Sequence, residues 1–262
     1  MRWLLIVAVL MAAACATKAA PAAPACEISP EDHAWIDASL DAWRFTANEI
    51  TGVANVRTFD AVFFDDDCVL TSANAFSAAS LADVVWSATP HAGEITLPDA
   101  QTMPAGVTSF ASADGARAFF VMSTPSVWRA AGVTNEALGL ETMMTGVLLH
   151  EGSHVAQFGS YGARISAIVA AGQVPEDDVN DDMIQQRFGE NAEFAASVER
   201  ETALLLQITN TPDEAEARRL ARQARELMRA RHVRWFTGAD AYLIEAEDTW
   251  LTLEGSGQWV AY

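Results

Sequence analysis

Two histidines and a glutamate lie close together in the segment TGVLLHEGSHVAQF, residues 145–158. His150 and His154 are four positions apart, so in a helix both rings project from one face and can bind the same ion. Glu151 directly follows His150, and its carboxylate can take a proton from a water molecule that the ion activates. This H-E-x-x-H spacing is typical of zinc hydrolases, and it predicts a Zn²⁺ site with its own general base.

The residues around the motif favour this interpretation because they are apolar: Val147, Leu148, Leu149, Val155 and Phe158. Imidazole and carboxylate groups that are buried without partners cost several kcal/mol, and a bound metal ion removes that cost. The chain has only 5 histidines in 262 residues, so a chance match to the motif is improbable. Two core histidines with other partners are the alternative interpretation.

A zinc hydrolase needs a third protein ligand, which must come from further along the chain. The only later histidine, His232, lies in an arginine-rich segment, so a glutamate is the expected ligand. The segment NAEFAASVERETALLLQIT, residues 191–209, offers Glu193, Glu199 and Glu201.

Helical geometry separates these three glutamates. At about 100° per residue, one side of the segment is apolar, formed by Phe194, Val198, Leu205 and Ile208. Glu201 lies near the middle of that stripe, Glu199 on its flank and Glu193 toward the opposite side. We therefore predict Glu201 as the third ligand. An ion pair with Arg164 is the alternative role for Glu201. Glu199 is the next candidate, as a ligand or as a hydrogen-bond acceptor from a ligand histidine.

With these residues the chain resembles the gluzincin class of zinc metallopeptidases, in particular exported bacterial members with a long insertion. Those proteins place H-E-x-x-H on one helix and a glutamate ligand on a later helix, which His150, Glu151, His154 and Glu201 match. The resemblance implies a zincin-like fold and a peptide or protein substrate. It also implies that an edge strand ahead of the motif helix binds the substrate backbone; ARAFFVMSTPSVW, residues 116–128, stands in that place. A core strand is the other interpretation of this segment.

The C-terminal stretch TLEGSGQWVAY is similar to the E-G-x-x-x-Y segment that carries the glutamate ligand in aminopeptidase-type gluzincins. Glu254 is thus an alternative third ligand. It follows His154 by 100 residues, much further than in that family, and Trp259 stands where the tyrosine would be. The resemblance also implies a residue that stabilises the oxyanion opposite Glu151, and Tyr161 and Tyr242 are the candidates.

The elements that must position these residues change along the chain. A helix is expected over residues 29–51, and strands within residues 50–59, 61–72, 94–98 and 116–128. Helical patterns then follow from Asn135 or Leu140 to Phe158, at residues 191–209, after Pro212 and at 239–262. A small N-terminal sheet and a mostly helical C-terminal half that carries the motif predict an α+β, zincin-like fold in one domain, residues 26–262.

The first 25 residues have the pattern of a secretory signal: Arg2, an apolar run and then small residues. Processing before Cys26 is expected; the alternative is a lipoprotein signal that ends before Cys15, which would then carry a lipid anchor. An exported, periplasmic or extracellular protein permits disulfides, so we expect Cys26 and Cys68 to be bonded.

Removal of residues 1–25 takes away Arg2 and Lys18, so the net charge falls from −19 to −21 and no lysine remains. Such a surface repels nucleic acid, and a DNA- or RNA-binding role is excluded. The sequence gives no indication of oligomeric state. We predict a zinc metallopeptidase. Hydrolysis of another amide or ester, or a non-catalytic binding protein on a zincin-like scaffold, are the alternatives; the intact Glu151 disfavours the latter.

Overall fold

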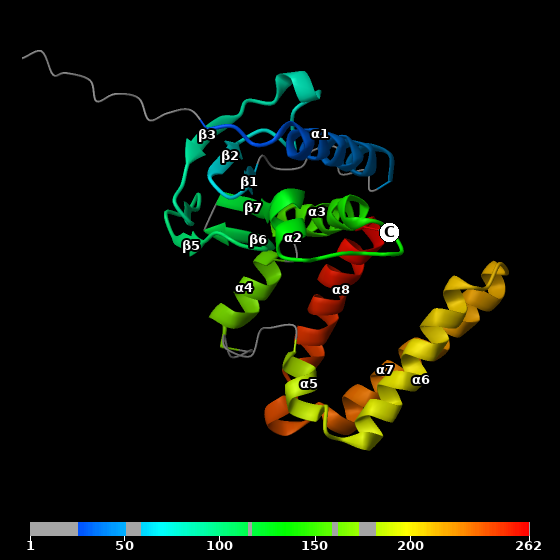
Figure 1. Ribbon diagram of the computed structural model, residues 1–262. Helices are drawn as coiled ribbons and strands as arrows, with labels where there is room; N and C mark the ends of the chain where they lie inside the picture. Colours follow the sequence, from blue (N-terminus) through cyan, green and yellow to red (C-terminus); the bar gives the residue numbers. More distant parts are fainter. Residues whose placement is uncertain (1–25, 51–58, 115–116, 159–161, 173–181, 262) are drawn as a thin grey trace, which may run out of the picture.

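The structure, a computed structural model, describes residues 26–50, 59–114, 117–158, 162–172 and 182–261 (Figure 1). Most strands come first and most helices afterwards, which confirms the predicted α+β class. In chain order the elements are α1 (Pro30–Phe45), β1 (Asp60–Phe64), β2 (Cys68–Ser72), β3 (Ser87–Pro90), β4 (Glu94–Thr96), β5 (Thr102–Pro104), β6 (Ser109–Asp114), β7 (Arg117–Ser123), α2 (Pro125–Ala130), α3 (Leu140–Gln157), α4 (Ala163–Ala170), α5 (Met183–Phe188), α6 (Ala192–Thr209), α7 (Glu214–Trp235) and α8 (Leu243–Ala261).

A five-stranded mixed sheet forms the N-terminal half, in the order β3-β2-β1-β7-β6. Only the central pair, β1 and β7, is parallel; the other neighbours are antiparallel. Side chains alternate between its faces. Ala61 and Phe63 of β1 join a large core with α1 and α3, whereas Val62 and Phe64 join a second core that the β4–β5 hairpin covers through Ile95.

Hydrogen bonds and close packing hold α3 against α1 on the first face of this sheet. Trp35 Nε1 of α1 donates a hydrogen bond to the Glu141 carbonyl oxygen of α3 at 3.1 Å. Further along α3, a Cβ atom on Gly152 would come within 2.9 Å of the Trp43 ring. Gly152 is the residue between Glu151 and Ser153 in the motif, so its lack of a side chain lets the motif helix approach α1 closely.

In the helical half, α6 and α7 form a long antiparallel hairpin, and α8 returns from its base to lie beside α3 (Figure 1). Asn191 caps α6 and Asp213 caps α7, each accepting hydrogen bonds from backbone N–H groups of the first turn. An aromatic cluster of Met183, Phe194, Phe236 and Leu243 joins the hairpin base to the start of α8.

The main differences from the expected elements lie in the sheet. The segment 61–72 forms the β1–β2 hairpin, and residues 51–58 of the expected strand at 50–59 lie outside the described residues. β6, which the sequence did not indicate, is an edge strand, and β7, formed by part of the segment 116–128, is an inner strand.

Cys26 and Cys68 form the predicted disulfide, with a Cα–Cα distance of 5.5 Å. None of the described helices has the length and apolarity that a membrane span requires.

Candidate metal centre

Three side chains from two helices converge at one point, His150 and His154 of α3 and Glu254 of α8. The Nε2 atoms of the two histidines are 2.9 Å apart. The Glu254 carboxylate lies 3.2 Å from Nε2 of His150 and 3.3 Å from Nε2 of His154. One ligand atom from each residue lies within 4.8 Å of the other two, so the three residues could hold a metal ion.

These distances fit the tetrahedral geometry that zinc prefers. Ligand atoms at about 2.0–2.1 Å from a tetrahedral ion are about 3.3 Å from one another, close to the observed distances of 2.9, 3.2 and 3.3 Å. The Nδ1 atoms of His150 and His154 are buried without a hydrogen-bond partner among the described residues. On both rings Nε2 is the atom nearest to the Glu254 carboxylate, and an ion would bind on that side.

Close packing of α8 on α3 brings Glu254 to the histidines. A Cβ atom on Gly257, one turn after Glu254, would come within 2.9 Å of Nδ1 of His150. Near the end of α8, the backbone of Ala261 lies beside Gly146 of α3, 3.6 Å from where a Cβ atom on that glycine would be. The contact at Gly146 would be an ordinary van der Waals distance, so Gly257 is the glycine that permits the close approach.

The electrostatic environment favours neutral histidine, the form that binds metals. Burial lowers the pKa of His150 below its ordinary value, and the neighbouring His154 lowers it further, whereas the Glu254 carboxylate acts in the opposite direction. The lowered pKa of His150 is thus compatible with a metal-binding role.

A cavity of about 410 Å³ opens beside the three residues and is also lined by Glu151. Its other walls are mostly apolar: Phe110 and Ala111 of β6, Phe158, and Trp250 and Leu253 of α8, with Gly162 and Ser166 completing the lining. Glu151, the predicted general base, therefore shares one cavity with a candidate metal site and an apolar surface.

Glu201, the predicted third ligand, does not belong to the group of His150, His154 and Glu254 that could hold a metal ion. Glu201 is buried on α6, as its position in the apolar stripe predicts, but its partner is Arg231 of α7, at 3.2 Å. The alternative role of Glu201 in an ion pair thus matches the structure in kind but not in partner, since Arg164 pairs with Glu245 on the surface. Glu199 is exposed on α6. The structure instead brings together the residues of the second candidate set, with Glu254 as the glutamate.

Other expected site residues have different positions. Tyr161 lies outside the described residues. Tyr242 packs against the aromatic cluster at the base of the hairpin, so its proposed role at the oxyanion has no support from its position. The edge strand beside the motif helix is β6 rather than β7, and its Phe110 and Ala111 line the cavity. The sequence missed β6 and the apolar wall formed by Trp250 and Leu253.

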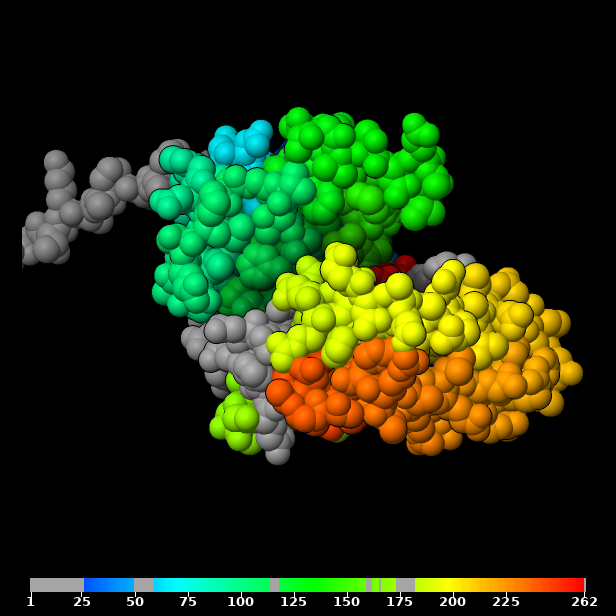
Figure 2. Space-filling view, turned by 90° about the horizontal axis from the view of Figure 1, so that it is seen from below, coloured from blue at the N-terminus to red at the C-terminus, as the bar shows by residue number. Residues whose placement is uncertain are grey.

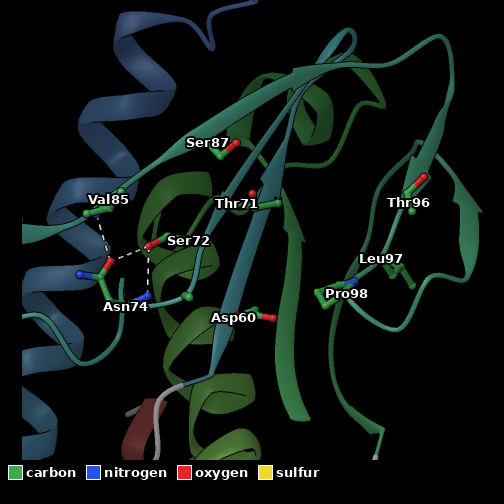
Figure 3. A pocket seen from close by; sticks show the side chains of 10 residues that line it. Asp60, Thr71, Ser72, Asn74, Val85, Ser87, Thr96, Leu97 and Pro98 are labelled. Atoms are coloured by element: carbon green, nitrogen blue, oxygen red, sulfur yellow. Dashed lines mark hydrogen bonds between the residues drawn. The ribbon is translucent and has the colours of Figure 1, made fainter. Parts of the chain in front are cut away.

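A second hollow, of about 460 Å³, lies near β2, β3 and the β4–β5 hairpin (Figure 3). Its lining is rich in hydroxyl and amide groups, among them Thr71, Ser72, Asn74 and Ser87. The Asn74 side-chain oxygen accepts hydrogen bonds from Ser72 Oγ at 2.9 Å and from the Val85 N–H at 3.0 Å (Figure 3). These hydrogen bonds hold the loop between β2 and β3 in place. The metal-ligating atoms converge elsewhere, between α3 and α8.

Comparison of the chain with protein-family models, with curated proteins and with solved structures found no significant match. The class of protein is therefore defined by the site itself: an α+β protein in which a His-x₃-His pair on one helix and a glutamate on a later helix could hold a metal ion.

Proposed function

We propose that the chain is a zinc-dependent metallopeptidase. The observation that carries the proposal is the convergence of His150, His154 and Glu254, with Glu151 lining the same cavity. Two imidazoles and one carboxylate are the ligand set of many catalytic zinc sites, which leave a position for water or substrate. When bound, the ion would act as a Lewis acid and lower the pKa of a water molecule.

In this proposal each residue has one role. His150 and His154 would hold the ion through Nε2, and Glu254 would hold it through its carboxylate. Glu151 accepts the proton of the attacking water and returns it to the nitrogen of the leaving amine, so the proton is conserved over the reaction. Because Glu151 is next to His150 on α3, the helix fixes the base relative to the metal ligands.

A peptide is the substrate class that the surroundings favour. β6 is at the edge of the sheet, with β7 on one side only, and two of its residues line the cavity. An extended peptide can add to such an edge through backbone hydrogen bonds, while a side chain enters a neighbouring pocket. The apolar walls from Phe110, Phe158 and Trp250 favour an apolar side chain there.

We further propose that the protein acts outside the cytoplasm. The Cys26–Cys68 disulfide fits export, because such bonds persist in oxidising compartments. Cys15, the candidate lipid-anchor site, lies outside the described residues. Mass measurement of the exported protein distinguishes lipidation at Cys15 from cleavage before Cys26.

Metal content and peptidase activity of matched variants test the proposal. The wild-type chain is expected to hold about one zinc per molecule and to cleave a mixed fluorogenic peptide library. Glu254→Gln and His154→Ala should lose zinc and activity together. Glu151→Gln should keep the zinc and lose activity, by a factor of at least ~10². Glu199→Gln, on the exposed face of α6, serves as the control and should change neither.

The same experiment separates the alternatives. Zinc binding without cleavage of any peptide, but with ester or non-peptide amide hydrolysis that Glu151→Gln abolishes, would point to another zinc hydrolase. Zinc binding with no hydrolysis of any of these substrates would point to a binding protein. A wild-type chain that holds no zinc after reconstitution would contradict the proposal.

A further inference from the structure

A buried ionic network joins the α6–α7 hairpin to α8. Arg231 of α7 contacts Glu201 of α6 through Nε at 3.2 Å and Glu247 of α8 through Nη1 at 2.8 Å. The other carboxylate oxygen of Glu247 lies 2.5 Å from Nε2 of His232. All four side chains are buried, Arg231 to within 2% of full burial.

The surroundings of this network make it rigid. The Arg231 guanidinium lies over the rings of Phe194 and Phe236, at 5.5 and 5.6 Å, and His232 stacks on Phe236. Burial by itself lowers the pKa of Arg231, but the hydrogen bonds and charges of Glu247 and Glu201 outweigh this effect and raise it, so the arginine is charged. Charges buried in this way must stay paired, which fixes the positions of their carboxylate partners.

Glu247 and Glu254 are on the same face of α8. They are seven residues apart, which is about two turns, or about 10 Å along the helix axis. Residues at this spacing form one stripe, here made of Leu243, Glu247, Trp250, Glu254 and Gly257. Trp250, in the middle of the stripe, packs against the aromatic cluster of the hairpin base and also lines the metal cavity.

This stripe links two sets of contacts that determine where α8 lies. At one end Leu243 and Glu247 fix the helix to the hairpin, and at the other Gly257 fixes it against His150. A helix turn is stiff, so a rotation or shift at Glu247 would move Glu254 relative to the histidines of α3. Figure 1 shows the hairpin extending away from the sheet and α3, and in Figure 2 it is the yellow and orange part of the surface.

We propose that Glu247 is a positioning residue for the metal site: it holds α8, through Arg231 and His232, in the register that brings Glu254 to His150 and His154. This inference rests on the proposed function, since it assigns the role of the helical hairpin in the same metal site. In this arrangement the α6–α7 hairpin fixes the position of Glu254 through its contacts with α8.

Zinc affinity of the full exported chain, measured by competition with a chromophoric chelator, tests the inference. Glu247→Gln removes the charge that pairs with Arg231, and Glu247→Asp keeps that charge but shortens the side chain. We expect either change to weaken zinc binding by about tenfold, as changes to groups that orient metal ligands do. Far-UV circular dichroism of the metal-free variants should match that of the wild type.

Glu245→Gln is the matched control, because Glu245 is also on α8 but pairs with Arg164 on the surface. It should leave zinc affinity within about twofold of wild type. A double-mutant cycle then separates positioning from general destabilisation. In a Glu254→Gln background, Glu247→Gln should have no further effect on the residual zinc affinity, because the ligand that it positions is gone.

The outcomes are distinct. If wild type and Glu245→Gln bind one zinc and both Glu247 variants bind it as tightly, Glu247 has no positioning role and the metal site stands. An equal loss from Glu247→Gln with and without Glu254 would also overturn the inference. If Glu247→Gln fails to fold, the zinc affinity of Glu247→Asp tests the inference in its place. If the wild type binds no zinc, the proposed function fails and the inference with it.

Discussion

At the scale of single residues, Gly257 is the most sensitive position near the site. A Cβ atom there would lie 2.9 Å from His150 Nδ1, whereas Gly255, two residues earlier on α8, has nothing within 4 Å of such an atom. Gly257→Ala should push α8 from α3 and weaken zinc binding by about tenfold. Gly255→Ala should leave zinc binding unchanged and raise stability by about 0.5–1 kcal/mol, the helix preference of alanine over glycine.

Isothermal titration with zinc and thermal unfolding of the two glycine variants check this prediction. Equal zinc affinity in Gly257→Ala and Gly255→Ala would show that the contact with the His150 ring does not constrain the site.

Glu201 is expected to contribute to stability rather than to metal binding. Its carboxylate is buried against Arg231, and removing one partner of a buried ion pair costs about 3 kcal/mol or more. Glu201→Gln should therefore lower the free energy of unfolding, measured with urea, by about 3 kcal/mol, while the zinc stoichiometry stays at the wild-type value. Loss of zinc from a folded Glu201→Gln chain would contradict the assignment of Glu254 as the third ligand.

The residues of the motif could be predicted from the sequence, but the third ligand could not. His150, Glu151 and His154 are fixed relative to one another by one helix, so their spacing in the sequence is enough to predict their relative positions. Burial of Glu201 was also predicted from helical periodicity. Its partner was not, because a buried carboxylate can bind a metal ion or an arginine, and the register of α7 against α6 brings Arg231 to it.

At the scale of elements, the order of the strands in the sheet could not be predicted from the sequence. The segment of β7 has strong strand character, but its place in the sheet depends on pairing with β1 and β6. β6 has the sequence SFASAD, with no β-branched residue, so its strand preference is weak and the pairing with β7 determines it. The strand that forms the sheet edge at the cavity is thus determined by how the strands pair, and neither segment alone predicts it.

The disulfide is the element-scale feature with the clearest expected effect. It ties the chain just before α1 to the first residue of β2, across a separation of 42 residues. A loop of that length corresponds to about 4 kcal/mol of stabilisation through the entropy of the unfolded chain. Cys26→Ser/Cys68→Ser should lower the free energy of unfolding by about that amount in urea titrations without dithiothreitol.

Zinc content provides the control for the disulfide variant. The bond lies at β2, away from α8, so the folded double variant should keep its metal. A variant with wild-type stability would show that the bond adds nothing to the folded state.

At the scale of the whole molecule, the candidate ligands come from parts of the chain that are far apart in sequence. His154 and Glu254 are separated by 100 residues, which include the whole α6–α7 hairpin. A bound ion would therefore cross-link the motif helix, which packs on the sheet, to the last helix, which packs on the hairpin. Such an ion stabilises the folded state only, because the ligands are dispersed in the unfolded chain.

Metal removal should consequently lower the thermal stability of the whole protein. An ion present at about a thousandfold over its dissociation constant adds about 4 kcal/mol, which for a chain of this size raises the melting temperature by about 10 °C. Calorimetry in zinc and in excess chelator measures this difference, and Glu254→Gln should show much less of it. Hydrogen exchange should slow most in α3 and α8, where the ligands lie, and least in the outer part of the α6–α7 hairpin. A melting temperature that is the same with zinc and with chelator would mean that no ion links these helices.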